Sequence, residues 1–145
     1  MMIDREQHLR FSRLEKSVPG LHQAFNTLTA AHAYFQGAGE LRSISVSDAC
    51  EDGSIEATFN GIRIRFELLL TVDYRQLPLG RVVCSQCHGL DCAALQTFLG
   101  DFTFDAEGET DFEPAADGAV RRLDAGAPWI ILNFLDKALE ANRSA

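Results

Sequence analysis

The most regular alternation of apolar and polar residues lies between positions 55 and 74. Apolar residues occupy every second position on both sides of Asn60-Gly61, which is typical of strands that bury one face. Asn-Gly favours a two-residue type I′ turn because both residues tolerate positive φ. The pattern therefore predicts an antiparallel hairpin with an apolar face toward the core and a charged face toward water. Its expected cross-strand pairs are Phe59 with Ile62, Ala57 with Ile64, Ile55 with Phe66, Glu56 with Arg65, and Thr58 with Arg63.

Helical periodicity marks both ends of the chain. It predicts a first helix over residues 3–17 and a second over residues 21–35. We expect a break at Pro19 because the residue before a proline is disfavoured in helical conformation. Residues 128–145 predict a C-terminal helix with Pro128 in its first turn. The expected apolar stripe of this last helix is Ile131, Leu135, Ala138 and Leu139.

Shorter segments complete the predicted order of elements. The pattern predicts strands over residues 42–50 and 81–87 and a short helix over residues 91–99. It also predicts a second hairpin over residues 101–113, turning near Glu107-Gly108, and a loop over residues 114–127. This order lacks the strand–helix–strand alternation that demands a parallel sheet. We therefore expect an α+β fold, an antiparallel meander sheet of about four to six strands. Two N-terminal helices and one C-terminal helix should pack on one face of it, in a single domain over residues 1–145.

Charge narrows the classes of partner. The chain has 145 residues and a formal net charge of −8, and its isoelectric point is about 4.9. This balance argues against nucleic acid and against an anionic membrane surface, since both attract basic proteins. It fits solubility or a basic protein partner. No stretch reaches the ~18 apolar residues of a membrane span, and the charged start MMIDREQHLR is unlike a signal peptide. We expect a cytoplasmic location, where free thiols are favoured over disulfides.

The stretch CSQCHGLDC holds three of the four cysteines. Zinc is one possible ligand, because thiolates and imidazole are the groups that it prefers. The candidate metal ligands are Cys84, Cys87, His88 and Cys92. The C-x-x-C-H spacing also matches haem attachment and a redox pair, but the chain shows neither an export signal nor a thioredoxin-like order of elements. We favour the interpretation that Cys84 and Cys92 are small buried hydrophobic residues. On that interpretation no cofactor is expected, and zinc stays the open alternative.

Carboxylates gather in the second half of the chain. Between Arg81 and Arg121 there are eight acidic residues and no Lys or Arg, and over residues 101–113 the acidic residues fall at odd positions. With the period of a strand, they would share one face. That face is either solvated or an electrostatic docking surface for a basic partner. The candidate partner-binding residues are Arg63, Arg65 and Glu67 on the first hairpin and Asp105, Glu107, Glu109 and Asp111 on the second.

Catalytic signatures are missing from the sequence. It contains no P-loop, G-x-S-x-G, H-E-x-x-H or G-x-G-x-x-G motif. Among the four histidines, His22 and His32 have no obvious acidic partner nearby in the sequence, and each of His8, His22 and His32 is more typical of a surface or boundary residue than of a base. An enzyme is therefore the less favoured class.

In size, acidity and predicted class the chain resembles the small, acidic, dimeric chaperones of type III secretion effectors. That family has an α+β fold and an amphipathic C-terminal helix. The resemblance involves no motif, so it assigns no residue a role. We expect a non-catalytic protein-interaction protein, adaptor or chaperone-like, with a homodimer as its expected assembly. One alternative is a metal- or thiol-dependent protein built on the cysteine cluster. Another is a small-molecule-binding protein or enzyme with a pocket between sheet and helices.

Overall fold

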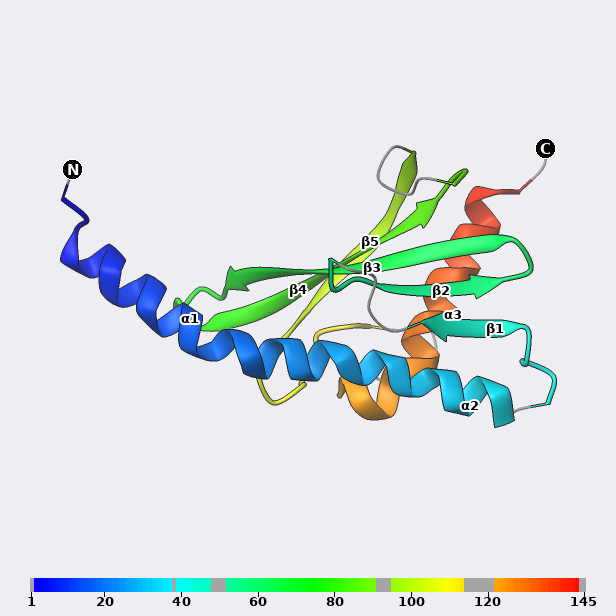
Figure 1. The fold of residues 1–145 in the computed structure, drawn as a ribbon, viewed down its shortest axis with the longest axis horizontal. Helices are drawn as coiled ribbons and strands as arrows, with labels where there is room; N and C mark the ends of the chain where they lie inside the picture. The colour runs from blue at the N-terminus through cyan, green and yellow to red at the C-terminus, as the bar shows by residue number, and fades with distance from the viewer. Residues whose placement is uncertain (1, 38, 48–51, 91–94, 114–121, 144–145) are drawn as a thin grey trace.

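The computed structural model describes residues 2–37, 39–47, 52–90, 95–113 and 122–143 (Figure 1). The elements are, in order, α1 (Arg5–Asn26), the 3₁₀ helix η1 (Thr27–Ala30), α2 (Ala31–Gly37), β1 (Ile44–Ser47), β2 (Ile55–Phe59), β3 (Ile62–Val72), β4 (Pro78–Cys87), β5 (Gln96–Phe104) and α3 (Leu123–Ala141). The strands form one antiparallel sheet in the order β1-β2-β3-β4-β5. The predicted α+β class and antiparallel meander are confirmed.

The β2–β3 hairpin has the predicted register. Its backbone reverses at Asn60 and Gly61, which have φ angles of 46° and 89°, as a type I′ turn requires. All five predicted cross-strand pairs are present, from Phe59 with Ile62 to Ile55 with Phe66. Alternation and turn chemistry therefore sufficed to place this hairpin.

The predicted break at Pro19 is wrong. One helix, α1, runs through Pro19 and bends into η1 only after Asn26. Proline removes one backbone hydrogen bond and crowds the carbonyl four residues earlier, at a cost of about 3 kcal/mol. Leu14 and Leu21, on either side of Pro19, are both buried in the core. Their burial is worth about 1.5–3 kcal/mol each, enough to keep the helix intact.

Two further boundaries differ from the prediction. Residues 96–99 belong to strand β5 and not to a helix, while residues 91–94 of that predicted helix lie outside the described residues. A β-bulge between Cys84 and Ser85 shifts the pairing with β5. The alternation of apolar and polar residues along β5 is therefore interrupted, and the sequence pattern does not predict a strand there. Helix α3 begins at Leu123, five positions before Pro128.

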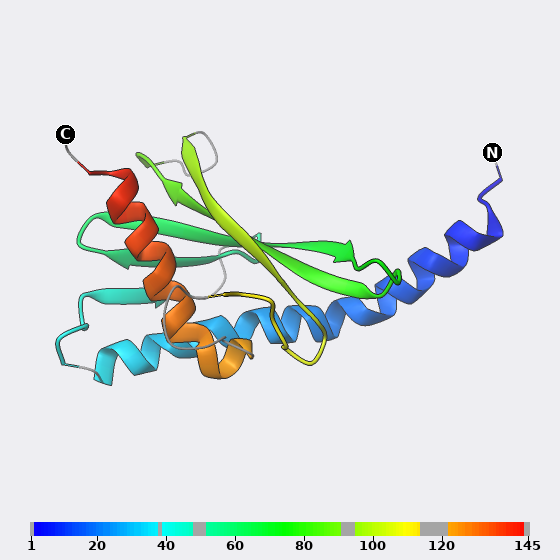
Figure 2. The ribbon, with the colours of Figure 1, turned by 180° about the vertical axis from the view of Figure 1, so that it is seen from behind.

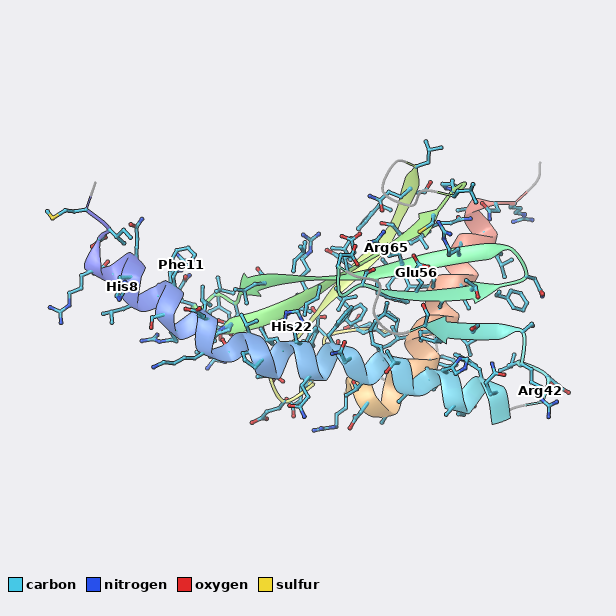
Figure 3. All side chains as sticks on the ribbon, in the orientation of Figure 1. His8, Phe11, His22, Arg42, Glu56 and Arg65 are labelled. Atoms are coloured by element: carbon cyan, nitrogen blue, oxygen red, sulfur yellow. The ribbon has the colours of Figure 1, made fainter. Side chains whose placement is uncertain are left out.

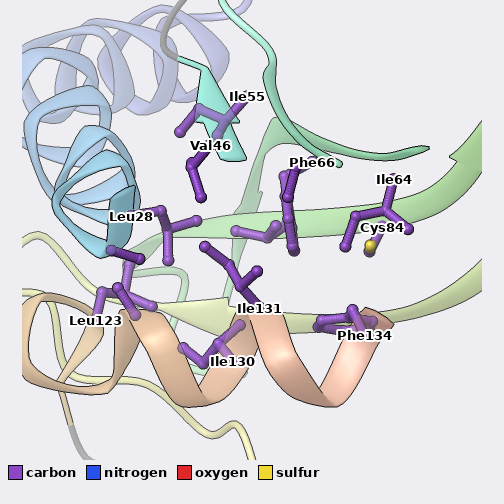
Figure 4. Packing of buried hydrophobic residues seen from close by; sticks show 14 of the residues in the cluster. Leu28, Val46, Ile55, Ile64, Phe66, Cys84, Leu123, Ile130, Ile131 and Phe134 are labelled. Atoms are coloured by element: carbon purple, nitrogen blue, oxygen red, sulfur yellow. The ribbon is translucent and has the colours of Figure 1, made fainter. Parts of the chain in front are cut away.

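The core lies between one face of the sheet and the helices. Seen from behind, α3 crosses the strands and the α1–α2 rod runs along their lower side (Figure 2). Phe134 of α3 packs edge-on against Phe66 of β3, with ring centroids 5.6 Å apart. Ile131 and Leu28 extend this cluster toward η1 (Figure 4). No helix in the described part of the chain is long and apolar enough to span a membrane.

Side chains of α2 cover the outer edge of β1. The Val46 N–H donates to His32 Nδ1 at 3.1 Å, and Gln36 Nε2 donates to the Ile44 carbonyl at 3.0 Å. Unpaired edge groups are sites where other strands add to a sheet. Helix α2 therefore blocks this edge.

Candidate functional site

The cysteine stretch does not converge on one point. On β4, Cys84 lies opposite the core residue Phe66, and Cys87 lies opposite Arg63 of the outer face. Since side chains alternate between the faces of a strand, the sulfurs of Cys84 and Cys87 leave the sheet on opposite sides. Figure 4 shows the Cys84 sulfur on the core side, between the sheet and α3.

The other members of the predicted metal set have separate roles. His88 Nε2 is 2.8 Å from Thr97 Oγ1 in a hydrogen bond, and Cys87 is disulfide-bonded. Free thiols were expected throughout, and that expectation is wrong for Cys87. Cys92 lies outside the described residues. Within the part of the chain that the structure describes, no group of three His, Cys, Asp or Glu side chains is placed to hold a metal ion.

Cys84 behaves as a core residue. It is a free thiol with no exposed surface. Burial raises its pKa well above the ordinary value, although the positive charge of Lys137 opposes that shift. A thiol held in its neutral form is a poor nucleophile and a poor metal ligand.

On the outer face of the sheet the charged side chains are engaged with neighbouring segments (Figure 3). Arg65 forms an ion pair with Asp52, and its Nε lies 3.5 Å from Glu67 Oε1. Arg63 donates to the Gly89 carbonyl at 3.3 Å. The three candidate residues Arg63, Arg65 and Glu67 therefore share one face, as predicted, but Arg63 and Arg65 hold loops onto the sheet, and Glu67 pairs with Arg65.

The acidic segment forms a tight turn after β5. Asp105 Oδ1 accepts from the N–H groups of Glu107 and Glu109, both at 3.0 Å, and Asp111 Oδ1 accepts from the Thr103 N–H at 2.7 Å. Two of the four candidate carboxylates thus stabilise the backbone. Glu107, Glu109 and Asp111 are exposed. Because Asp105 and Asp111 hold the backbone, a charge-reversal test of this surface should change Glu107 and Glu109 and retain the other two.

This turn packs against the start of α3. The Leu123 N–H donates to the Gly108 carbonyl at 2.9 Å. In the first turn of α3, the hydrogen bond from the Ala125 N–H lowers the pKa of Asp124, and Arg122 lowers it further. A recess of about 190 Å³ lies between this region and α1. Its polar lining includes Glu107, Arg122 and Asp124.

A second polar recess brings together residues that are distant in the sequence. It measures about 140 Å³, and its lining includes His22 of α1, Asp52, Ser54 and Glu67. A histidine beside carboxylates can serve in proton transfer. Here, however, both carboxylates form ion pairs with Arg65. Among the described residues, the contacts of these two carboxylates are thus with Arg65 and not with His22.

A largely apolar groove lies between the β1–β2 end of the sheet and the second half of α3. It has a volume of about 210 Å³. Its lining residues are Leu41, Ile44, Phe59, Leu132, Leu135, Asp136 and Leu139. Leu139, on one lip, is 46% exposed. We refer to these seven residues as the apolar groove.

Sequence reasoning missed the apolar groove, although α3 contained a signal. The core stripe predicted for this helix includes Leu139 and omits Leu132. With Leu132 and Leu139 both apolar, the apolar stripe of α3 is wider than the part of the helix that the sheet covers. An apolar face wider than one packing partner can bury is the pattern that would have pointed to the groove.

A second apolar surface lies at the opposite end of the molecule. The first part of α1 extends past the β3–β4 hairpin, and Phe11 lies there on the extended part (Figure 3). Its side chain is 66% exposed, whereas Leu14 of the next turn is buried. The two surfaces are separated by most of the length of the α1–α2 rod (Figure 1).

Comparison with protein-family models, with curated proteins and with solved structures finds no match in any of the three.

Proposed function

We propose that this chain is a non-catalytic protein-interaction protein, adaptor or chaperone-like, whose apolar groove binds an apolar segment of a partner protein. The observation that carries the proposal is the lining of the groove: apart from Asp136, its side chains are hydrocarbon. Enzyme sites combine apolar walls with several converging polar groups. A groove with one carboxylate at its side suits an apolar anchor residue better than it suits chemistry.

The size of the groove limits its occupant. About 210 Å³ is smaller than the roughly 300–1,000 Å³ typical of small-molecule pockets. It is sufficient for one or two large aliphatic or aromatic side chains. Binding hot spots have this form, an anchor side chain that fills an apolar depression. A short segment with Leu, Met or Phe at its centre fits these dimensions.

Charge selects among such segments. Asp136 lines the groove and is exposed, and the chain carries a formal net charge of −8. A carboxylate at the side of an apolar site favours a partner with a Lys or Arg next to its anchor. We therefore expect a basic, apolar-anchored segment, which agrees with the basic protein partner expected from composition.

Selection from a library of displayed random peptides tests this function. Peptides of about a dozen residues cover the groove and its flanks. Selection on the whole protein should enrich sequences with one large apolar residue beside Lys or Arg. Leu139→Glu should abolish binding of the enriched peptides, because it places a carboxylate on the lip of the groove. Asp136→Lys should retain the apolar preference and remove the basic one.

Leu90→Glu is the matched control. Leu90 is fully exposed and is not among the residues that line the groove, so this variant should bind the enriched peptides as the unchanged chain does. Calorimetry or fluorescence anisotropy measures each affinity. Equal affinity for the Leu139→Glu variant and the unchanged chain would rule the groove out as the binding site.

A further inference from the structure

The apolar stripe of α1 is longer than the body that it packs against. Phe11, Leu14, Val18, Leu21 and Phe25 follow one another at spacings of three and four residues, so they share one face of the helix. Leu14, Leu21 and Phe25 are buried, whereas Phe11 is 66% exposed. We call residues 2–13 the overhang. In this segment, the face of α1 that packs on the core further along the helix is exposed to solvent.

Exposed apolar side chains also lie at the base of the overhang. The end of the β3–β4 hairpin, which we call the tip, presents Leu69, Leu70, Tyr74 and Leu77. Leu69 and Leu70 line a small recess together with Val18 and Leu21 of α1. The tip is thus beside the point where α1 leaves the body, as Figures 1 and 2 also show.

We propose that this end of the molecule is a homodimer interface, in which the overhangs of two copies pack antiparallel about a two-fold axis. The free end of each overhang then reaches the tip of the partner, because the tip lies at the base of the partner's own overhang. Such an interface is self-complementary, as closed two-fold symmetry requires. It lies at the opposite end of the molecule from the apolar groove and does not depend on the function proposed for that groove.

Charge favours a second copy as the occupant. The overhang and the turn that follows it carry Arg5, Arg10, Arg13 and Lys16 against Asp4, Glu6 and Glu15, a net charge of +1. Since the whole chain has −8, the rest of the molecule has −9. At long range, a helical segment of net positive charge is attracted to the acidic body of another copy. The same acidic body would be repelled by an anionic membrane.

The area available is sufficient for a stable dimer. Two-fold pairing covers seven exposed apolar side chains of the overhang and tip, all of them except Leu9: Met2, Ile3, Phe11, Leu69, Leu70, Tyr74 and Leu77. With roughly 100 Å² for each half-exposed large side chain, seven such residues approach the ~800 Å² per partner of a standard interface. The overhang alone would fall short of this area, as would the tip alone.

Sedimentation equilibrium of the full chain tests the dimer. We expect a dimer at micromolar concentrations and a weaker one at high salt. Phe11→Glu should raise the dimer dissociation constant by about 100-fold or more, because the residue occurs twice in a two-fold interface. The matched control is Leu9→Glu. Leu9 is 54% exposed, but it lies outside the stripe, on the other side of the helix, and this variant should stay dimeric.

Cross-linking tests the arrangement independently of affinity. Gln7 continues the stripe one turn before Phe11, so Gln7→Cys should form a covalent dimer under oxidation, whereas Leu9→Cys should not exceed the unchanged chain. Leu139→Glu, which disables the groove, should leave the dimer intact and thereby separates the two proposals. A monomeric unchanged chain, or equal behaviour of the Phe11→Glu and Leu9→Glu variants, would overturn the dimer.

Discussion

Cys84 and Cys87 belong to one strand, and their sulfurs lie on opposite faces of the sheet. Phe66 is the cross-strand neighbour of Cys84 in the core, and Arg63 is that of Cys87 on the outer face. A C-x-x-C pair joins one metal ion or one disulfide when the chain turns between the two residues. On a regular strand the period of two separates them, so the spacing alone is no evidence for a shared site.

The protonation state of Cys84 gives a first prediction. Because burial raises its pKa, the folded protein retains the thiol proton at alkaline pH values where the unfolded chain loses it. The contribution of Cys84 to stability is therefore complete below the pKa of the unfolded chain and falls as pH rises above it. Chemical denaturation at several alkaline pH values should show a smaller loss of stability in Cys84→Ala than in the unchanged chain.

Alkylation checks the same point directly. Cys84 should resist iodoacetamide in the folded protein and react after denaturation in urea, as peptide mass spectrometry can detect. Rapid labelling of Cys84 under native conditions would contradict its placement in the core.

The sequence predicted the fold correctly where several local sequence patterns required the same structure. In the β2–β3 hairpin, the alternation, the Asn60-Gly61 turn and the pairing of Glu56 with Arg65 all require one register, and that register is observed. Where local sequence patterns disagreed, contacts between distant segments determined the structure that formed. The β-bulge after Cys84 interrupts the apolar–polar alternation of β5, and no local sequence pattern predicts a bulge.

The candidate surfaces were harder to predict for a different reason. Alternation places Arg65 on the outer face correctly, but it does not reveal the ion pair with Asp52. The apolar groove depends on how far α3 overlaps the β1–β2 end of the sheet, which only the packing determines. Single positions such as Leu139 therefore appear in the sequence as core residues, although the sheet leaves them half exposed.

Replacement of Pro19 should stabilise the protein. The proline lies inside α1 with its side chain exposed, so alanine restores a helical hydrogen bond and removes no core contact. We expect Pro19→Ala to raise the free energy of unfolding by about 1–3 kcal/mol, measured by urea denaturation. Gln23→Ala, another exposed position of α1, should change it by less than about 0.5 kcal/mol. A lower stability for Pro19→Ala would mean that the proline is needed for the path of the helix.

Two glycines should respond in opposite directions to alanine. A Cβ at Gly80 would lie 2.4 Å from Phe104 Cζ and 2.9 Å from Leu68 Cδ1, so Gly80→Ala should lower the free energy of unfolding by about 1–3 kcal/mol through overpacking. At Gly37 the Cβ would meet nothing within 4 Å, and Gly37→Ala should be neutral or stabilising by up to about 1 kcal/mol. Thermal and urea denaturation of both variants measure the difference. Equal effects at the two positions would contradict the close contact of β4 with β5.

The cover on the β1 edge should contribute to stability through two side chains. His32 Nδ1 accepts from the Val46 N–H at 3.1 Å and Gln36 Nε2 donates to the Ile44 carbonyl at 3.0 Å. Each replacement by alanine leaves a backbone group of β1 without its partner, and we expect a loss of about 1 kcal/mol for each in urea denaturation. Because the exposed edge can then pair with another strand, His32→Ala/Gln36→Ala should also aggregate faster on heating, as light scattering can follow. His22→Ala, at an exposed position of α1, is the control and should do neither. Unchanged stability and unchanged aggregation in the double variant would mean that the two hydrogen bonds do not protect the edge.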